Sequence, residues 1–245
     1  MAQRYQCSPK TIQRRLKQAS LHQTHPHYPV ANIIMDTTYF GRHFGVMVFM
    51  NSLNGQIIHK QYIERESAAL YEQGLRDIIN KGIHIQSITA DGFKGLSKLF
   101  PEIPFQLCQF HQQQTIRRYL TRRPKSFAAK ELKMLADSLF VSTKAELKQQ
   151  LENWHTQHKS YLNELSYSAD GKQKWYTHKH LRSAYNSLKR NLDYLFTYEQ
   201  NRELMMLNMT NRLEGKFGEL KTKIRCHAGM GIESKKLFID SFFGL

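Results

Sequence analysis

The sequence predicts an α/β protein with a mixed five-stranded sheet and an all-helical insertion. Two observations carry this prediction. Residues 30–111 contain five apolar, strand-like runs with an amphipathic helical stretch among them, whereas residues 112–207 show helical periodicity alone. Strands that first meander and then alternate with helices form a mixed sheet covered by helices.

The first 20 residues predict part of a helix-turn-helix. A short helix over residues 1–5 leads through a turn to a second helix that starts at Pro9, with Ser8 as its N-cap. On this helix the side chains that could face DNA are Lys10, Gln13, Arg14 and Lys17. The alternative is a plain basic surface helix. A complete motif needs a preceding helix, so we expect weakly specific, salt-sensitive DNA binding from this segment. Residues 21–29, with prolines and histidines, read as a linker.

The predicted strands follow in order. "VANIIMDTTY" is an almost continuous apolar run ending at Asp36, as expected of a strand buried on both faces. "HFGVMVFMNS" and "GQIIHKQYIE" are joined by Asn54-Gly55, a strong hairpin signal. Residues 67–80 are helical, "HIQSITADG" is a fourth strand ending at Asp91, and "PFQLCQFH" is a short fifth one.

After His111 no strand pattern returns, and "AAKELKMLADSLF", "KAELKQQLENWHTQH" and "HLRSAYNSLKRNLDYLF" predict successive helices. We interpret Trp154 and Trp175 as packing residues of this block rather than platforms on which bases stack. The resulting division is 1–20 for the partial helix-turn-helix, 21–29 for the linker, 30–111 for the first part of the core, 112–207 for the insertion and 208–245 for the C-terminal helical part of the core.

The charge of the chain predicts a nucleic-acid partner. Its 36 lysines and arginines against 20 acids give a net charge of +16 and a pI near 9.8, the balance expected of a nucleic-acid-binding protein. The cations concentrate in three stretches without acids, residues 1–35, 103–130 and 171–191. Candidate phosphate contacts outside the N-terminal helix are Arg117, Arg118, Lys216, Lys221, Lys223 and Arg225.

Several classes of protein are excluded or disfavoured. No apolar run approaches the ~20 residues of a membrane span, and the N-terminus lacks the apolar region of a secretory signal. Three cysteines give no disulfide framework, which favours a reducing cytoplasm. No phosphate-binding loop, dinucleotide fingerprint or nucleophile elbow occurs, so NTPase, dehydrogenase and hydrolase functions have no support.

Asp36 and Asp91 are the first candidate site residues, because both are expected at strand ends. A buried carboxylate is costly unless it is paired or binds metal. For Asp36 the alternative is a turn capped together with Thr37 and Thr38, and for Asp91 it is the common Asp-Gly turn. With a third acid, the pair could hold two Mg²⁺ ions for phosphoryl transfer.

Glu214 stands near the start of an amphipathic helix over residues 207–225. Asn211-x-x-Glu214 fits a capping box, which is the simpler interpretation. Our prediction is that Glu214 is a metal ligand first and a helix cap at most second.

Cys108-x-x-His111 has the spacing of half a zinc site. The other Cys-His pair, Cys226-His227, is adjacent and supplies no suitable second half, so zinc is disfavoured. If the fifth strand pairs beside the first, Cys108 and His111 come near the carboxylates.

The motifs "IIMDTTYF", "ITADGFKGL", "LCQFH" and "TNRLEGKFGELKTKIR", in this order and with a helical block before the last one, resemble the DDE transposases of bacterial insertion sequences, specifically the Mutator-related group. The resemblance covers the chain from Ile33 to the C-terminus, and "SPKTIQRRL" is similar to the DNA-binding helix ahead of such cores. It implies a ribonuclease-H-like core that binds Mg²⁺ or Mn²⁺, two ions, and cleaves and transfers DNA strands. By position, it implies Asp36, Asp91 and Glu214 as the catalytic triad, with Cys108 and His111 as accessory residues.

The expected partners are double-stranded DNA at the element ends and target, together with further copies of the chain on that DNA and no membrane. The expected location is the bacterial cytoplasm, at the nucleoid. Two alternatives remain: a decayed or truncated transposase that only binds DNA, and a ribonuclease-H-like nuclease that cuts without joining. The three acids favour activity, the incomplete helix-turn-helix favours decay, and the helical insertion favours a transposase over a simple nuclease.

Overall fold

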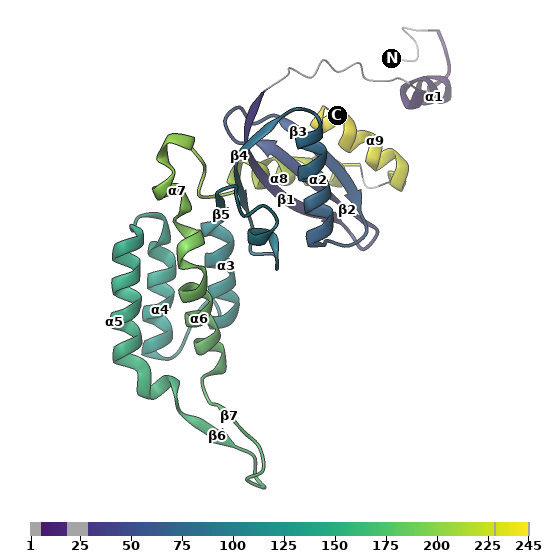
Figure 1. Ribbon diagram of the computed structural model, residues 1–245. Coiled ribbons are helices and arrows are strands. Elements are labelled where there is room, and N and C mark those ends of the chain that lie inside the picture. The colour runs from purple at the N-terminus through teal and green to yellow at the C-terminus, as the bar shows by residue number, and fades with distance from the viewer. Residues whose placement is uncertain (1–5, 19–28, 228, 245) are drawn as a thin grey trace.

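The computed structural model describes residues 6–18, 29–227 and 229–244. At its centre lies a five-stranded sheet in the order β3-β2-β1-β4-β5 (Figure 1). The strands are β1 (Val30–Phe40), β2 (Phe44–Asn51), β3 (Ile57–Ile63), β4 (His84–Ala90) and β5 (Phe105–Leu107). The first three form an antiparallel meander, whereas β4 pairs parallel to β1 and β5 parallel to β4. This confirms the predicted α/β fold with a mixed, ribonuclease-H-like sheet. The fifth strand lies at the edge beside β4, however, and not beside β1 as we had considered.

Alternation along β1 divides the core between the two faces of the sheet. Ile33 and Met35 belong to the core on the side of α2 (Ala68–Asn80). Ile34, between them, belongs to the core built with α8 (Asn211–Arg225) and α9 (Ile232–Phe243). Because successive side chains of a strand point to opposite faces, the position of a residue in β1 decides which helices it meets.

The insertion is a helical bundle that extends away from the sheet (Figure 1). Its elements are α3 (Gln109–Leu120), α4 (Phe127–Asp137), α5 (Lys144–Leu162), α6 (Lys179–Leu195), the short α7 (Thr197–Gln200), and three-residue 3₁₀ turns at Ser138–Phe140 and Arg202–Leu204. Another such turn, Leu96–Lys98, lies between β4 and β5. Thr143 begins α5 with a complete capping box, in which Glu146 reaches back to its N–H. Trp154 is buried and donates its indole N–H to the Ala128 carbonyl, which confirms its predicted packing role.

Two expectations about the insertion are wrong. It is not all-helical, because β6 (Leu165–Tyr167) and β7 (Lys174–Tyr176) form an antiparallel hairpin between α5 and α6. Trp175 lies on this hairpin and is 44% exposed, so it is not a packing residue of the bundle. The hairpin has only three residues in each strand, too few to produce a recognisable alternation in the sequence.

The N-terminal part is described from residue 6. Helix α1 (Pro9–Gln18) is present, and Ser8 accepts a hydrogen bond from the N–H of Thr11 as an N-cap does. The helix expected at residues 1–5 and most of the linker, residues 21–28, lie outside the described residues, so the helix-turn-helix itself stays a prediction. Among the described helices, none is long and apolar enough to cross a membrane.

Candidate active site

Asp36 and Asp91 lie on neighbouring parallel strands at matching positions. The register pairs Ile34 with Thr89, and Asp36 and Asp91 each follow two residues later. Asp36 lies inside β1, which continues to Phe40 through pairing with β2, so the expectation that it ends the strand, and the alternative that it caps a turn, are both wrong. Asp91 follows β4 directly, and its Oδ1 accepts a hydrogen bond from the N–H of Phe93. Asp91 thus caps the loop after β4 with one oxygen, and the Asp91-Gly92 pair itself is not assigned as a turn. The second carboxylate oxygen is free of that bond.

The same alternation decides to which face of the sheet the Asp36 side chain points. Asp36 lies two residues after Ile34 and therefore points to the side of α8. Leu213 and Phe217 of α8 are buried in that core and fix the rotation of the helix. Glu214 follows Leu213 and is held at the margin of this contact, where it faces the two aspartates.

Glu214 is not the glutamate of a capping box. The N-cap of α8 is Thr210, not Asn211, and it makes no side-chain bond to a helix N–H. Instead, the Thr210 hydroxyl donates to Glu214 Oε1 at 2.9 Å. The carboxylate thus reaches back to the N-cap side chain and toward His111 of α3, without bonding a backbone N–H of its own first turn.

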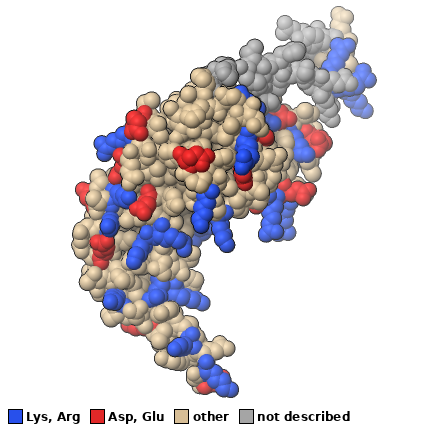
Figure 2. Space-filling view, in the orientation of Figure 1, with Lys and Arg blue, Asp and Glu red and all other residues tan. Residues whose placement is uncertain are grey.

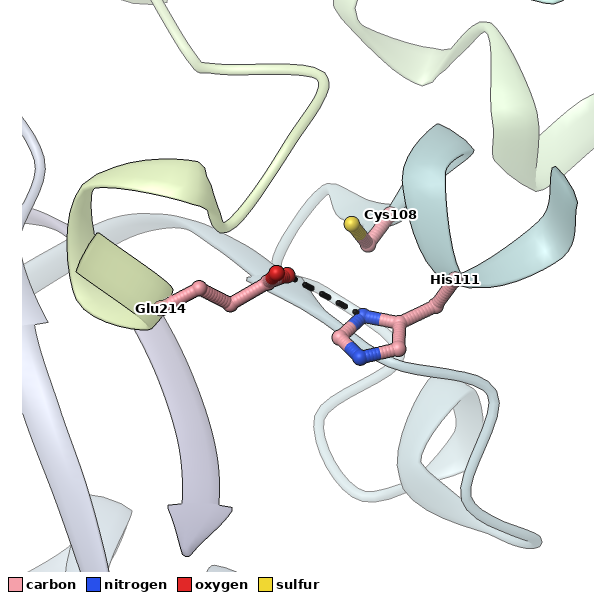
Figure 3. Close-up of side chains that lie close together, drawn as sticks. All are labelled: Cys108, His111 and Glu214. Carbon is pink, nitrogen blue, oxygen red and sulfur yellow. Dashed lines mark ion pairs between the residues drawn. The ribbon is translucent and has the colours of Figure 1, made fainter. Parts of the chain in front are cut away.

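Cys108 and His111 approach Glu214 from the other side (Figure 3). Cys108 is the N-cap of α3, and His111 lies in its first turn, so one helix start presents both. His111 Nδ1 lies 3.7 Å from Glu214 Oε1, and one ligand atom from each of the three residues lies within 4.8 Å of the others. His111 Nδ1 is buried and has no hydrogen-bond partner among the described residues.

A fourth acid, Glu66, was missed by sequence analysis. It lies between β3 and α2, where its N–H bonds to the Tyr39 hydroxyl and its carboxylate accepts from the Tyr71 hydroxyl. No motif surrounds it, and only the route of the loop brings it to the site. The cavity that results has a volume of about 440 Å³ and is lined, among others, by Asp36, Glu66, Asp91, His111, Glu214 and Lys221.

The electrostatics of the cavity are those of crowded carboxylates. Burial is the main reason that the pKa of Asp36 is raised to about 7. The charge of His111 opposes that rise, whereas Asp91 and Glu214 add to it. Burial also raises the pKa of Glu66. A cation in the cavity would remove the mutual repulsion of these acids.

For His111, burial and the neighbouring charges act on the pKa in the reverse sense to Asp36. Burial alone would lower its pKa, but the Cys108 sulfur and the carboxylates of Asp36 and Glu214 outweigh burial and raise it to about 9. Burial would raise the pKa of the Cys108 thiol, yet its contacts with His111 and Thr210 lower it overall. At neutral pH His111 is therefore a cation at the rim of the acidic cavity.

The types of donor in the cavity fit a hard divalent cation, although the three carboxylates do not form a group with all ligand atoms within 4.8 Å of one another. Carboxylate oxygens from Asp36, Asp91 and Glu214 on one cavity are the ligands that Mg²⁺ and Mn²⁺ prefer. Cys108, His111 and Glu214 form the one group of at least three close candidate ligands found among the described residues. Three ligands are one short of a structural zinc site.

The cations predicted to bind DNA are only partly gathered here. Lys221 lines the cavity, whereas Lys223 on the same helix is paired with Glu219 at 2.8 Å. Arg117, in the last turn of α3, is paired with Asp137 at 3.0 Å. Figure 2 shows that lysines and arginines nevertheless continue along the insertion. The remaining predicted contacts lie elsewhere: Lys10 and Arg14 are exposed on α1, Arg118 bonds Thr115, Lys216 and Arg225 lie on α8, and the side chains of Gln13 and Lys17 fall outside the description.

The sheet is of the ribonuclease-H-like type, and three acids from separate elements line one cavity beside it. The chain matches the family described as "Transposase, Mutator family" over residues 53–217, more than half of its length. It therefore belongs to the Mutator family of transposases.

A comparison of folds found the structure titled "Structure of the HTLV-2 integrase catalytic core domain in complex with magnesium (dimeric form)". That match has 18% sequence identity and a TM-score of 0.27, and covers 63% of this chain and 99% of the integrase domain. A likeness this distant carries no argument about function. A comparison with curated protein sequences found no match.

Proposed function

We propose that this transposase cleaves DNA strands and joins them to a new site in a metal-dependent reaction, with Asp36, Asp91 and Glu214 as its catalytic residues. The observation that carries the proposal is their convergence. Parallel strands bring the two aspartates to matching positions, and α8 adds Glu214 across the same cavity. The raised pKa of Asp36 supports it, because structural carboxylates are seldom buried beside others of like charge.

Two Mg²⁺ or Mn²⁺ ions, held by these three residues, would activate the attacking oxygen and stabilise the leaving oxygen of the phosphodiester. The residues of the chain have their own tasks. Asp36 must be ionised to act as a ligand, and Thr210 holds the Glu214 carboxylate in its orientation. His111, protonated at neutral pH, offers a positive charge to a DNA phosphate at the rim.

Double-stranded DNA, at the element ends and at the target, is the proposed substrate. The net charge of +16 supports a polyanion, and Lys221 places one cation at the cavity itself. Strand transfer brings two element ends together, so we also propose that further copies of the chain assemble on the DNA.

The test is incubation of the protein with labelled DNA that carries flanked element ends, with Mg²⁺ or Mn²⁺. Nicked and joined products are expected from the wild type, and neither from Glu214→Gln. The matched control is Glu219→Gln on the exposed side of the same helix, which should retain full activity. Nicking without joining would favour a simple nuclease, whereas DNA binding without either product would favour a protein that has lost its activity.

A further inference from the structure

The β6–β7 hairpin lies at the far end of the insertion (Figure 1). Its aromatic side chains are exposed to solvent. Tyr167 is 61% exposed, Trp175 44% and Tyr176 43%. The strand register pairs Trp175 with Ser166, so these two share one face, while both tyrosines lie on the other. Among the described residues, no aromatic ring stacks on Trp175, whereas Arg182 covers the Tyr176 ring at 3.6 Å from its centroid.

The hairpin is fixed in place although it buries little surface. At its base, Thr177 bonds the Glu164 carbonyl at 2.9 Å and His178 stacks on Tyr161 with centroids 3.7 Å apart. At its tip, the Ser168 hydroxyl accepts from Gln173 N–H at 3.0 Å. An isolated two-stranded hairpin is marginal in water. One whose base is bonded and stacked at the ends of α5 and α6, and whose turn is closed by its own hydrogen bond, holds its exposed aromatic rings in a defined orientation.

The charge around the hairpin is complementary to a polyanion. The cations of the segment are Lys172, Lys174, Lys179 and Arg182. Its two acids are already engaged: Glu164 bonds His178 at 2.9 Å, and Asp170 accepts hydrogen bonds within the turn. Arg182 is held by the Leu162 carbonyl and the Asn163 side chain, whereas the three lysines make no ion pair among the described residues. An aromatic ring beside such lysines is the combination that binds unpaired bases of nucleic acid, through stacking and phosphate contacts.

Helix α6 connects this hairpin to the candidate active site. Lys179 and Asn186 are exposed on the helix, and Arg190 and Tyr194 follow on the same side at helical spacing. Arg190 and Tyr194 line a second cavity, of about 600 Å³, together with Asp91. At 1.5 Å per residue, the helix spans roughly 24 Å, or about seven base pairs of DNA at 3.4 Å each. Figure 2 shows basic side chains along the insertion down to its tip.

We propose that the hairpin is a second DNA-binding site, at which the Trp175 ring stacks on an unpaired nucleobase of the DNA whose scissile phosphate lies in the acidic cavity. This inference rests on the proposed function for the identity of the ligand. Because Trp175 lies before the start of α6, it places a distorted or locally opened base at least about seven base pairs from the phosphate that is cleaved. It also gives the exposed face of α6 a function, as the track along which the intervening phosphates lie.

The two tryptophans permit a direct test, since Trp154 is buried and Trp175 is exposed. The probes are a 30-base-pair duplex of mixed sequence and the same duplex with three unpaired thymines in one strand. Titrations in EDTA exclude turnover, and fluorescence anisotropy of labelled DNA reports binding independently. We expect the bulged duplex to quench the tryptophan emission of the wild type at saturation, and the emission of Trp175→Phe, which comes from Trp154 alone, to stay constant.

Affinity supplies the second measurement. Trp175→Ala should weaken binding of the bulged duplex about tenfold and binding of the paired duplex less than twofold. The matched control is Phe127→Ala, which removes a 65% exposed ring from α4 in the same insertion and should change neither affinity. Circular dichroism and thermal melting of both variants show whether the fold is retained.

The outcomes separate this inference from the proposed function. Saturated DNA binding without quenching of Trp175 overturns the stacking site, even if the protein cleaves and joins DNA in Mg²⁺. Quenching by the bulged duplex supports the site, even if no cleavage is found. Quenching that depends on protein concentration without DNA would show that the hairpin meets a second copy of the chain, and would overturn the inference.

Discussion

Thr210 joins the cysteine at the start of α3 to the glutamate of α8. Its hydroxyl donates to Glu214 Oε1 at 2.9 Å, its oxygen lies 3.3 Å from the Cys108 sulfur, and its N–H donates to that sulfur at 3.4 Å. Thr210 and Cys108 are both fully buried. The chain of contacts therefore fixes one oxygen of the Glu214 carboxylate and leaves the other for a cation.

The first prediction concerns this orientation. Thr210→Val keeps the volume of the side chain but removes the donor, so Glu214 should lose its fixed rotamer and the rate of strand cleavage should fall about tenfold. Thr210→Ser keeps the hydroxyl and should stay within about threefold of the wild type. Single-turnover cleavage at saturating protein measures both. Equal rates for the two variants would show that the hydroxyl does not position Glu214.

The second prediction concerns stability and pH. The pKa of Asp36 is raised to about 7 in the folded protein, from an ordinary value of 3.8. The folded state therefore binds a proton more tightly than the unfolded state. Its stabilising contribution is fully present below pH 3.8 and is lost as the pH rises through about 7. Without metal, Asp36→Asn should therefore be more stable than the wild type at pH 8, by on the order of 1–3 kcal/mol, and this advantage should shrink at pH 5.

Thermal melting at the two pH values measures this difference. The pKa of His111, raised to about 9, also makes the protein less stable as the pH rises, so the comparison must be made between variants and not within one protein. Addition of Mg²⁺ at pH 8 should raise the melting temperature of the wild type and leave Asp36→Asn nearly unchanged. An unchanged wild type would argue against cation binding at these carboxylates.

The sheet could be predicted because its strands are long and their turn is distinctive. The Asn54-Gly55 hairpin and the buried runs of β1 and β2 leave few alternatives for the first half of the core. The end of β1 was misplaced because a charged residue in an apolar run looks like its limit. Pairing of Asp36 with Val48 and of Thr38 with Val46 carries the strand further, and such long-range pairing has no local signal.

Those residues of the candidate site that lie within recognisable sequence motifs could be predicted. Asp36, Asp91 and Glu214 were found in this way, and the structure brings them to one cavity; their catalytic roles remain a proposal. Glu66 and Thr210 were missed because nothing near them in the sequence is unusual. The loop before α2 places the first, and the approach of α3 to α8 gives the second its role.

The third prediction concerns the packing of α2 on the sheet. A Cβ added at Gly74 would lie 2.3 Å from the Phe49 ring, which is itself fully buried. Gly74→Ala should therefore destabilise the protein by about 1–3 kcal/mol, through overpacking. Gly215→Ala on α8 is the matched control, because nothing lies within 4 Å of its Cβ position, and this change should stabilise the helix by up to about 1 kcal/mol. Urea denaturation of both variants measures the change in the free energy of unfolding. A Gly74→Ala protein as stable as the wild type would mean that the Phe49 ring can move.

The last prediction separates two lysines of α8 that are two residues apart. Lys221 lines the acidic cavity, whereas Lys223 is paired with Glu219 at 2.8 Å and lies over the Phe242 ring. A lysine that neutralises a phosphate releases about one counterion when DNA binds, and this release appears in the dependence of affinity on salt.

Lys221→Ala should therefore weaken binding to any duplex and reduce the slope of log K against log salt concentration by about one. Lys223→Ala should change the slope by much less, because its charge is already engaged with Glu219. DNA titrations between 50 and 200 mM salt, roughly the range over which such contacts are lost, compare the two variants. Equal slopes for both would place the DNA backbone along the outer side of α8 rather than at the cavity.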